Sequence, residues 1–162
     1  MFAIREATRA DAQLIVDMIR ELAEFERELD QVDITPEDIL RDGFSASPRF
    51  HALVAEWDGQ PAGYALYFFN YSTWAGRPGL FVEDLFVRAQ FRNKGIGKSL
   101  LRRMAVTARE HNCYGMRWEV LHWNTPAIEF YRSLGAKRQN EWWPVIFMGS
   151  AFEDFATQER AG

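Results

Sequence analysis

Residues 80–111 read LFVEDLFVRAQFRNKGIGKSLLRRMAVTAREH, and the fold can be worked out from this stretch. Leu80–Val87 is mostly apolar and partly β-branched, which is typical of a buried strand. Beyond it, apolar residues recur at three- and four-residue spacing, at Ile96, Leu100, Leu101, Met104, Ala105 and Ala108. That spacing places them on one face of an amphipathic helix. The sequence therefore predicts a strand, a short turn and a long helix.

The turn between strand and helix combines two glycines with positive charge. Glycine lets the backbone come close to a ligand. The first N–H groups of the following helix have no partner within the helix and lie at the positive end of its dipole. Arg92, Lys94 and Lys98 add three cations at this point. We therefore expect the turn to bind a phosphate or diphosphate, with a simple tight turn as the alternative.

Two familiar phosphate-binding motifs do not fit this turn. A P-loop would end at Gly97-Lys98-Ser99, but its first glycine would then fall on Arg92. The dinucleotide-binding motif G-x-G-x-x-G needs a small residue where Leu100 stands.

The pattern Arg92-x-x-Gly95-x-Gly97, after a strand and at the start of a helix, resembles the acyl-CoA pyrophosphate loop of the GNAT superfamily of N-acetyltransferases. The resemblance covers essentially the whole chain and is closest to the spermidine/spermine (diamine) and thialysine N-acetyltransferases. It implies an α/β fold in which one GNAT domain, residues 1–162, has a mixed, mostly antiparallel central sheet flanked by helices. The other matching segments are Glu21–Ala23, Tyr71–Arg77, Val82–Val87, Trp123-Asn124 and Phe130–Ala136.

Composition is that of a soluble protein of one domain, with 48% hydrophobic and 26% charged residues. The sequence shows neither a signal segment nor an apolar run long enough for a membrane, so we expect a cytoplasmic protein without a membrane partner. Cys113 is the single cysteine, and three histidines are scattered along the chain, so we expect no metal site.

The net charge of −4 conceals two oppositely charged segments. Residues 21–42 contain nine acidic residues against two arginines, and residues 88–117 contain eight basic residues against Glu110. Such an asymmetry favours two ligands, one anionic and one cationic. The acidic balance and the lack of a recognised binding module argue against nucleic acid.

Transfer of an acetyl group to an amine requires a base for the amine and an acid for the departing thiolate. Strand alternation predicts that Glu83 shares a face with Phe81, Leu85 and Val87, opposite Asp84. A carboxylate in so apolar a strand needs a partner or a function. The resemblance implies that Glu83 is the base, acting through water; a structural carboxylate is the alternative.

The acid implied by the resemblance is Tyr131, whose phenol stays protonated at neutral pH. From the residues alone, a core residue with its hydroxyl at the edge is the most common role of a tyrosine in a helix. The resemblance also implies acetyl-CoA as co-substrate, held by Leu85, Phe86, Val87, Arg92, Asn93, Lys94, Gly95, Ile96, Gly97, Lys98, Asn124, Thr125, Pro126 and Ala127. The acceptor, a small cationic amine such as a diamine, polyamine or thialysine, would contact Phe25, Glu26, Glu83, Asp84 and Trp74. For Trp74, packing or an interface is an equal alternative.

The remaining segments predict the other elements of the sheet and its helices. Thr8 and Thr35 are typical N-caps, and Asp58-Gly59 indicates a hairpin turn. The expected strands are residues 2–6, 50–57, 62–71, 80–87 and 116–121, with a closing hairpin from 136–138 and 141–148. Further helices are expected from about 9, 35, 95 and 125, with a loop over 72–79 and a short helix or disordered tail from 150.

Two questions stay open at this level. An N-acetyltransferase for a small amine is favoured over one for a protein or antibiotic amine, and over a non-catalytic acyl-CoA-binding regulator. The 24 aromatic residues exceed what one small core needs, which favours a homodimer. The segment 138–144 replaces the acidic, glycine-containing turn of the resembled enzymes, so the acceptor is less defined than the reaction.

Overall fold

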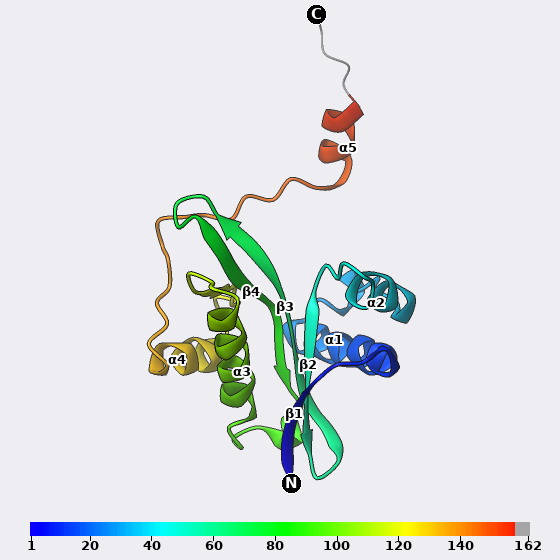
Figure 1. Cartoon of the computed structure of the whole chain (residues 1–162). Coiled ribbons are helices and arrows are strands. Elements are labelled where there is room, and N and C mark those ends of the chain that lie inside the picture. The colour runs from blue at the N-terminus through cyan, green and yellow to red at the C-terminus, as the bar shows by residue number, and fades with distance from the viewer. Residues whose placement is uncertain (158–162) are drawn as a thin grey trace, which may run out of the picture. The chain divides into compact units, whose positions relative to one another are not determined.

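The computed structural model describes residues 1–157, which form two compact units, Met1–Leu121 and the segment from His122 onward. The first unit contains a five-stranded sheet whose spatial order is the order along the chain (Figure 1). Its strands are β1 (Phe2–Glu6), β2 (His51–Trp57), β3 (Gln60–Ser72), β4 (Arg77–Val87) and β5 (Met116–Trp118). Neighbouring strands from β1 to β4 are antiparallel, and β5 lies parallel to β4. The predicted α/β fold with a mixed, mostly antiparallel sheet is confirmed, whereas a single domain over the whole chain stays a prediction.

Helices cover both faces of this sheet. Helices α1 (Ala12–Glu26) and α2 (Pro36–Gly43) lie on one side, and α3 (Ile96–Glu110) lies on the other (Figure 1). Met18 of α1 packs with Tyr64, Leu66 and Phe86 in one buried cluster, which identifies the sheet residues that face α1. Burial of each such side chain stabilises the fold by ~1.5–3 kcal/mol, so this layer holds β3 and β4 at a fixed distance from α1.

Local capping begins the first two helices as the sequence predicts. Thr8 and Asp11 form a reciprocal cap in which the Thr8 amide donates to the Asp11 carboxylate at 2.7 Å. Arg5 donates two hydrogen bonds of 2.8 Å to the same carboxylate, and this lowers the pKa of Asp11 to about 2. Thr35 repeats the motif with Asp38 at the start of α2.

The hairpin turns are tight. Asp58 and Gly59 have φ of 51° and 76°, the left-handed conformations that a two-residue turn between antiparallel strands requires. The loop expected over residues 72–79 is much shorter in the structure, because β3 continues to Ser72 and β4 already begins at Arg77. The strand expected at 116–121 ends at Trp118.

A bulge in β4 overturns the predicted orientation of Glu83. Leu66 pairs with Asp84 while Tyr67 pairs with Val82, so Glu83 is an extra residue without a partner in β3. Phe81 pairs with Phe68, whereas Leu85 pairs with Ala65. Side chains alternate along a strand, so residues 65 and 68 of β3 point to opposite faces of the sheet. Phe81 and Leu85 therefore lie on opposite faces, and the prediction that Glu83 shares one face with both was wrong.

The second unit holds helices α4 (Thr125–Ser133) and α5 (Gly149–Thr157). The start of α4 is as predicted: the Asn124 side chain caps it by accepting from the Ala127 amide at 3.3 Å, and Pro126 lies in its first turn. Gly135 follows the helix with φ of 89°, typical of a C-terminal cap. The predicted closing hairpin was wrong, since residues 136–148 form no strand. The tail prediction from residue 150 is met by α5 up to Thr157, and its remaining residues lie outside the described part of the chain.

Candidate active site

The loop that begins α3 has the geometry of an anion-binding turn. Asn93 and Gly95 have φ of 62° and 76°, and Gly95 directly precedes the helix. A Cβ at Gly95 would meet no atom within 4 Å, so the space beside this backbone is open. The first hydrogen bond back to the loop is that of the Ser99 amide, which donates to the Gly95 carbonyl at 3.0 Å. The preceding amides of the first turn are therefore available to a ligand at the positive end of the dipole.

The cations of this loop lie over aromatic rings. The Arg92 guanidinium is 5.0 Å from the centre of the Phe25 ring, and its Nε donates to the Val87 carbonyl at 3.0 Å. The Lys94 ammonium is 4.4 Å from the Trp57 ring. Lys98 is exposed in the first turn of the helix. These contacts are worth about 0.5–1 kcal/mol at exposed sites, which is small enough for an anion to redirect the cations.

The edge of β4 is open where the sequence predicts pantetheine contacts. Its ladder with β5 covers Leu80–Val82 and stops there, whereas β4 continues to Val87. Of the three predicted contacts, Phe86 is buried against α1, while Leu85 and Val87 are partly exposed. A strand edge without a neighbour offers N–H and C=O groups to an extended, amide-containing ligand.

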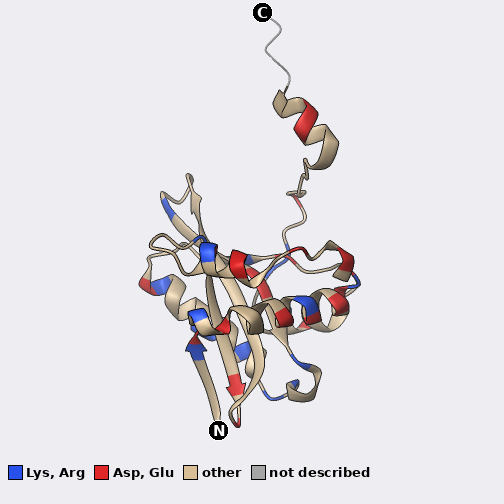
Figure 2. Cartoon of the chain, turned by 90° about the vertical axis from the view of Figure 1, so that its right-hand side faces the viewer, with Lys and Arg blue, Asp and Glu red and all other residues tan. Residues whose placement is uncertain are grey.

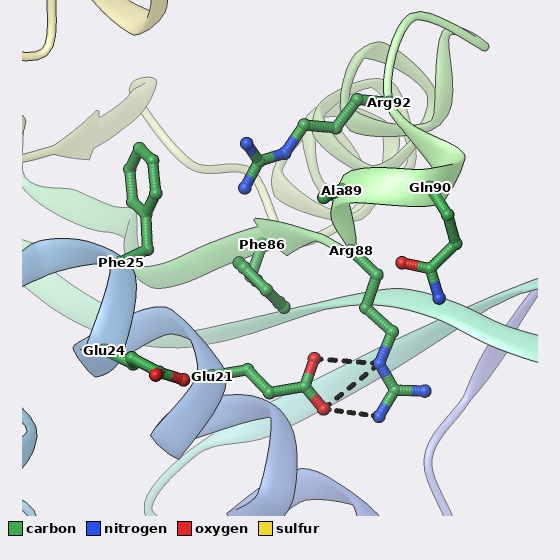
Figure 3. A pocket seen from close by; sticks show the side chains of 8 residues that line it. All are labelled: Glu21, Glu24, Phe25, Phe86, Arg88, Ala89, Gln90 and Arg92. Carbon is green, nitrogen blue, oxygen red and sulfur yellow. Dashed lines mark hydrogen bonds and ion pairs between the residues drawn. The ribbon is translucent and has the colours of Figure 1, made fainter.

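A hollow of about 550 Å³ lies between α1 and this end of β4 (Figure 3). It is lined by Glu21, Glu24, Phe25, Phe86, Arg88, Ala89, Gln90 and Arg92. Glu21 and Arg88 form an ion pair with a shortest distance of 2.6 Å along one wall, and Arg88 also donates to the Pro61 carbonyl at 2.9 Å. The guanidinium of Arg92 points across the hollow toward Phe25 (Figure 3). The hollow thus connects the cationic loop with the end of the acidic helix.

Three carboxylates gather on the strand and helix beside this hollow. Burial raises the pKa of Asp84 to about 6, the Tyr64 hydroxyl opposes this shift, and Glu83 and Glu26 add to it by repulsion. Burial also raises the pKa of Glu26, with a further contribution from Glu28. Glu83 itself is exposed at the bulge. Among the described residues no cation contributes to the shift at Asp84, so these carboxylates form an uncompensated acidic group.

Acidic residues also dominate the surroundings. Figure 2 shows Asp and Glu spread along α1 and α2 on the side that faces the viewer. Residues 21–42 carry a formal charge of −7, from nine acidic and two basic residues. Such a field concentrates cations near the site.

The other predicted acceptor contacts differ in position. Phe25 is 41% exposed at the end of α1 and lines the hollow, whereas Trp74 is 89% exposed in the β3–β4 turn at the opposite end of β4. The structure therefore brings Phe25, Glu26 and the β4 carboxylates into one region and leaves Trp74 outside it.

The predicted acid and the remaining cofactor contacts belong to the second unit. Tyr131 is partly buried on α4, and its ring lies 5.3 Å from that of Phe130. Asn124, Thr125, Pro126 and Ala127 form the first turn of the same helix. Because Asn124 already caps the Ala127 amide, its side-chain oxygen has a structural role there.

Three residues of the site were not singled out from the sequence. Trp57 contacts Lys94, Arg88 holds Glu21, and Tyr64 lies beside Asp84. An aromatic residue just before a hairpin turn or inside an apolar strand carries no distinctive pattern. Arg88 gave the one available signal in the sequence, because this basic residue directly follows the mostly apolar strand β4.

Within residues 1–157, no group of three or more His, Cys, Asp or Glu side chains has the arrangement of a metal site. None of the described helices is both long and apolar enough to span a bilayer.

Residues 15–136 match the acetyltransferase (GNAT) family. The chain is 42% identical to the thialysine N-ε-acetyltransferase of Sus scrofa, with 94% of this chain and 96% of that protein aligned. It is 37% identical to a human spermidine/spermine N(1)-acetyltransferase-like protein 1, over 83% of this chain and 20% of that protein. An integron cassette protein from the mobile metagenome of V. cholerae has the same fold, with a TM-score of 0.81 at 24% identity, covering 97% of this chain and 98% of that one. The chain therefore belongs to the GNAT family and is an acetyltransferase.

Proposed function

We propose that this enzyme transfers the acetyl group of acetyl-CoA to a primary amine of a small cationic acceptor, of the thialysine or diamine and polyamine type. The observation that carries the proposal is the uncompensated group formed by Glu26, Glu83 and Asp84. These carboxylates repel one another, and a ligand with two or more positive charges would remove that repulsion. The names of the 42% and 37% identical relatives, a thialysine and a spermidine/spermine-type acetyltransferase, support the same class of acceptor.

Acetyl-CoA fits the residues at the other end of the hollow. The open backbone beside Gly95 and the amides at the start of α3 suit its diphosphate, and Arg92, Lys94 and Lys98 supply positive charge. The unpaired edge of β4 from Glu83 to Val87 suits the amides of the pantetheine arm. This arrangement would direct the thioester along β4 toward the carboxylates at the bulge.

The reaction needs a neutral amine, and a lysine-like amine is protonated at neutral pH. With a pKa near ~10.4, deprotonation at pH 7 costs roughly 4–5 kcal/mol. We propose that Glu83 accepts this proton through a water molecule, a role to which its exposed position at the bulge is suited. The amine nitrogen then attacks the thioester carbonyl, the C–S bond breaks, and Tyr131 donates its phenolic proton to the departing thiolate. The acetylated nitrogen loses its remaining extra proton, which restores the phenol of Tyr131 through solvent. The products are the N-acetylated amine and free coenzyme A.

The test is a thiol-release assay with acetyl-CoA against thialysine, lysine, putrescine, spermidine, spermine and a peptide amine. A neutral-tailed monoamine of the same length as putrescine controls for the second positive charge. We expect release with the dicationic acceptors and at least tenfold lower kcat/KM with the monoamine. Thiol release with the peptide alone would favour a protein substrate, and no release with any amine would refute the proposal.

We further propose a cytoplasmic homodimer. Between residues 142 and 155 the second unit exposes large apolar side chains, among them Trp143 at 85%, Val145 at 91% and Ile146 at 75%. Exposed large apolar side chains that lie close together along the chain favour an interface between subunits. Sedimentation at micromolar concentration should give a dimer, and a monomer would count against this part of the proposal.

A further inference from the structure

Tyr64, in the layer of β3 and β4 that faces α1, has a buried hydroxyl that core packing alone does not explain. Tyr64 is 0% exposed and packs with Met18, Leu66 and Phe86. Its hydroxyl oxygen is fully buried and makes no hydrogen bond of ordinary geometry with any described residue. A buried hydroxyl is costly unless it serves a polar neighbour, so a phenylalanine would satisfy the packing alone.

The polar neighbour is Asp84. Tyr64 pairs with Phe86 and Leu66 pairs with Asp84, so Tyr64 and Asp84 are diagonal neighbours on one face of the β3–β4 pair. This diagonal is within reach of an aromatic side chain, and the two groups are close enough that each affects the pKa of the other. Glu26 of α1 and Glu83 of the bulge are the other charged groups that act on Asp84.

In this pair, the phenol can only be the hydrogen-bond donor and the carboxylate the acceptor. Burial raises the pKa of Tyr64 well above its ordinary value, so the phenol stays protonated and can only donate to an ionised carboxylate. Of the three groups that act on Asp84, Tyr64 alone favours the charged form. Burial and the two like charges raise the pKa of the Asp84 carboxyl and so favour its neutral form, which attracts an ammonium group less strongly than the carboxylate does.

We propose that Tyr64 is a positioning residue, whose hydroxyl holds the Asp84 carboxylate ionised and aimed at the ammonium group of the acceptor. This inference rests on the proposed function, because it assigns Asp84 to acceptor binding. Tyr64 does not touch the reacting atoms and acts through Asp84. It therefore controls the lowest pH at which a cationic acceptor binds.

The test compares Tyr64→Phe with Tyr67→Phe across pH 5.5–9. Tyr67 is a matched control, since it is a buried tyrosine of the same strand, 5% exposed, on the opposite face beside Thr107 of α3. In Tyr64→Phe, we expect kcat/KM for the amine to fall about tenfold at pH 6.5 and less than threefold at pH 8.5. The loss should lie in the KM for the amine, with the KM for acetyl-CoA unchanged, and Tyr67→Phe should follow the wild-type profile.

A second measurement keeps the inference separate from the proposed function. A ¹³C NMR titration of the Asp84 carboxyl, assigned by its loss in Asp84→Asn, reports ionisation without any turnover. The midpoint should be higher in Tyr64→Phe than in the wild type or Tyr67→Phe. An unchanged midpoint, or equal shifts in both variants, would overturn the role of Tyr64 even in an active enzyme. A wild type that acetylates no amine but shows the expected shift would refute the proposed function instead.

Discussion

Replacing Asp84 by Asn should make the protein more stable at neutral pH while it damages function. Burial raises the pKa of Asp84 from 3.8 to about 6, so the folded state holds this proton more tightly than the unfolded state does. Stability is therefore lost as the pH rises from about 4 to about 6, and the loss is complete above that range. At about 1.4 kcal/mol per pH unit, the ionised carboxylate lowers the free energy of unfolding by roughly 2–3 kcal/mol.

The assay is urea denaturation of the wild type and Asp84→Asn between pH 4 and pH 8, followed by tryptophan fluorescence. At pH 4 the two proteins should be equally stable, because Asp84 is then protonated in the folded state and resembles Asn in shape. By pH 7.5 the variant should be more stable by roughly 2–3 kcal/mol. Glu83→Gln is the matched control: Glu83 is adjacent but exposed, so its neutralisation should change stability by less than about 0.5 kcal/mol.

Two results would refute this reasoning. One is an Asp84→Asn variant that is no more stable than the wild type at pH 7.5, and the other is a difference between the two proteins that does not grow between pH 4 and pH 7. Either would mean that Asp84 is solvated or paired in the folded protein. If the variant is stabilised and loses kcat/KM for the amine, the carboxylate is retained for binding at the expense of stability.

Two further predictions concern the acid and the structural core. Tyr131→Phe should lower kcat at least tenfold and leave acetyl-CoA affinity nearly unchanged; unaltered turnover in a thiol-release assay would remove it as the acid. Asp11→Asn should destabilise the fold by about 2 kcal/mol at pH 7, because Arg5 lowers the pKa of Asp11 from 3.8 to about 2. The destabilisation should disappear as the pH falls from about 4 toward 2, and Asp17→Asn, on the exposed side of α1, should show no such dependence in urea denaturation.

Features determined by local sequence were predictable. The cap of α2 at Thr35, the turn at Asp58-Gly59 and the loop before α3 each depend on a few adjacent residues, and all three occur where expected. Short connections link β2 to β3 and β3 to β4, which agrees with the antiparallel pairing of these strands. The loop before α3 was recognised for the same reason, because its glycines and cations are contiguous, and its binding of a diphosphate stays a prediction.

Features that depend on pairing were not predictable. The bulge at Glu83 arises from the register between β3 and β4, which alternation within one strand cannot reveal. It changes the expected relation between Glu83 and its neighbours, and it leaves Asp84 half-buried while Glu83 is exposed. The role of Tyr64 likewise depends on a diagonal across two strands that are 20 residues apart along the chain, from Tyr64 to Asp84.

The closing hairpin was predicted from composition, but the structure does not form it. Residues 141–148 are rich in tryptophan, valine, isoleucine and phenylalanine, and this composition predicts a strand. A strand also needs a neighbour that satisfies its backbone, and among the described residues this segment has no such partner. Its apolar side chains are exposed instead, with Val145 at 91%.

The central claim is that the loop before α3 holds coenzyme A by its diphosphate, and calorimetric titration of coenzyme A tests it most directly. The wild type should release or absorb heat with one site per chain. Gly95→Ala should bind at least tenfold more weakly, since a side chain at φ of 76° strains the loop and fills the open space beside it. Gly76→Ala, with φ of 65° in the β3–β4 turn, carries a similar strain at the opposite end of β4 and should bind as the wild type does. Absence of binding by the wild type, or equal affinity in Gly95→Ala, would contradict the account.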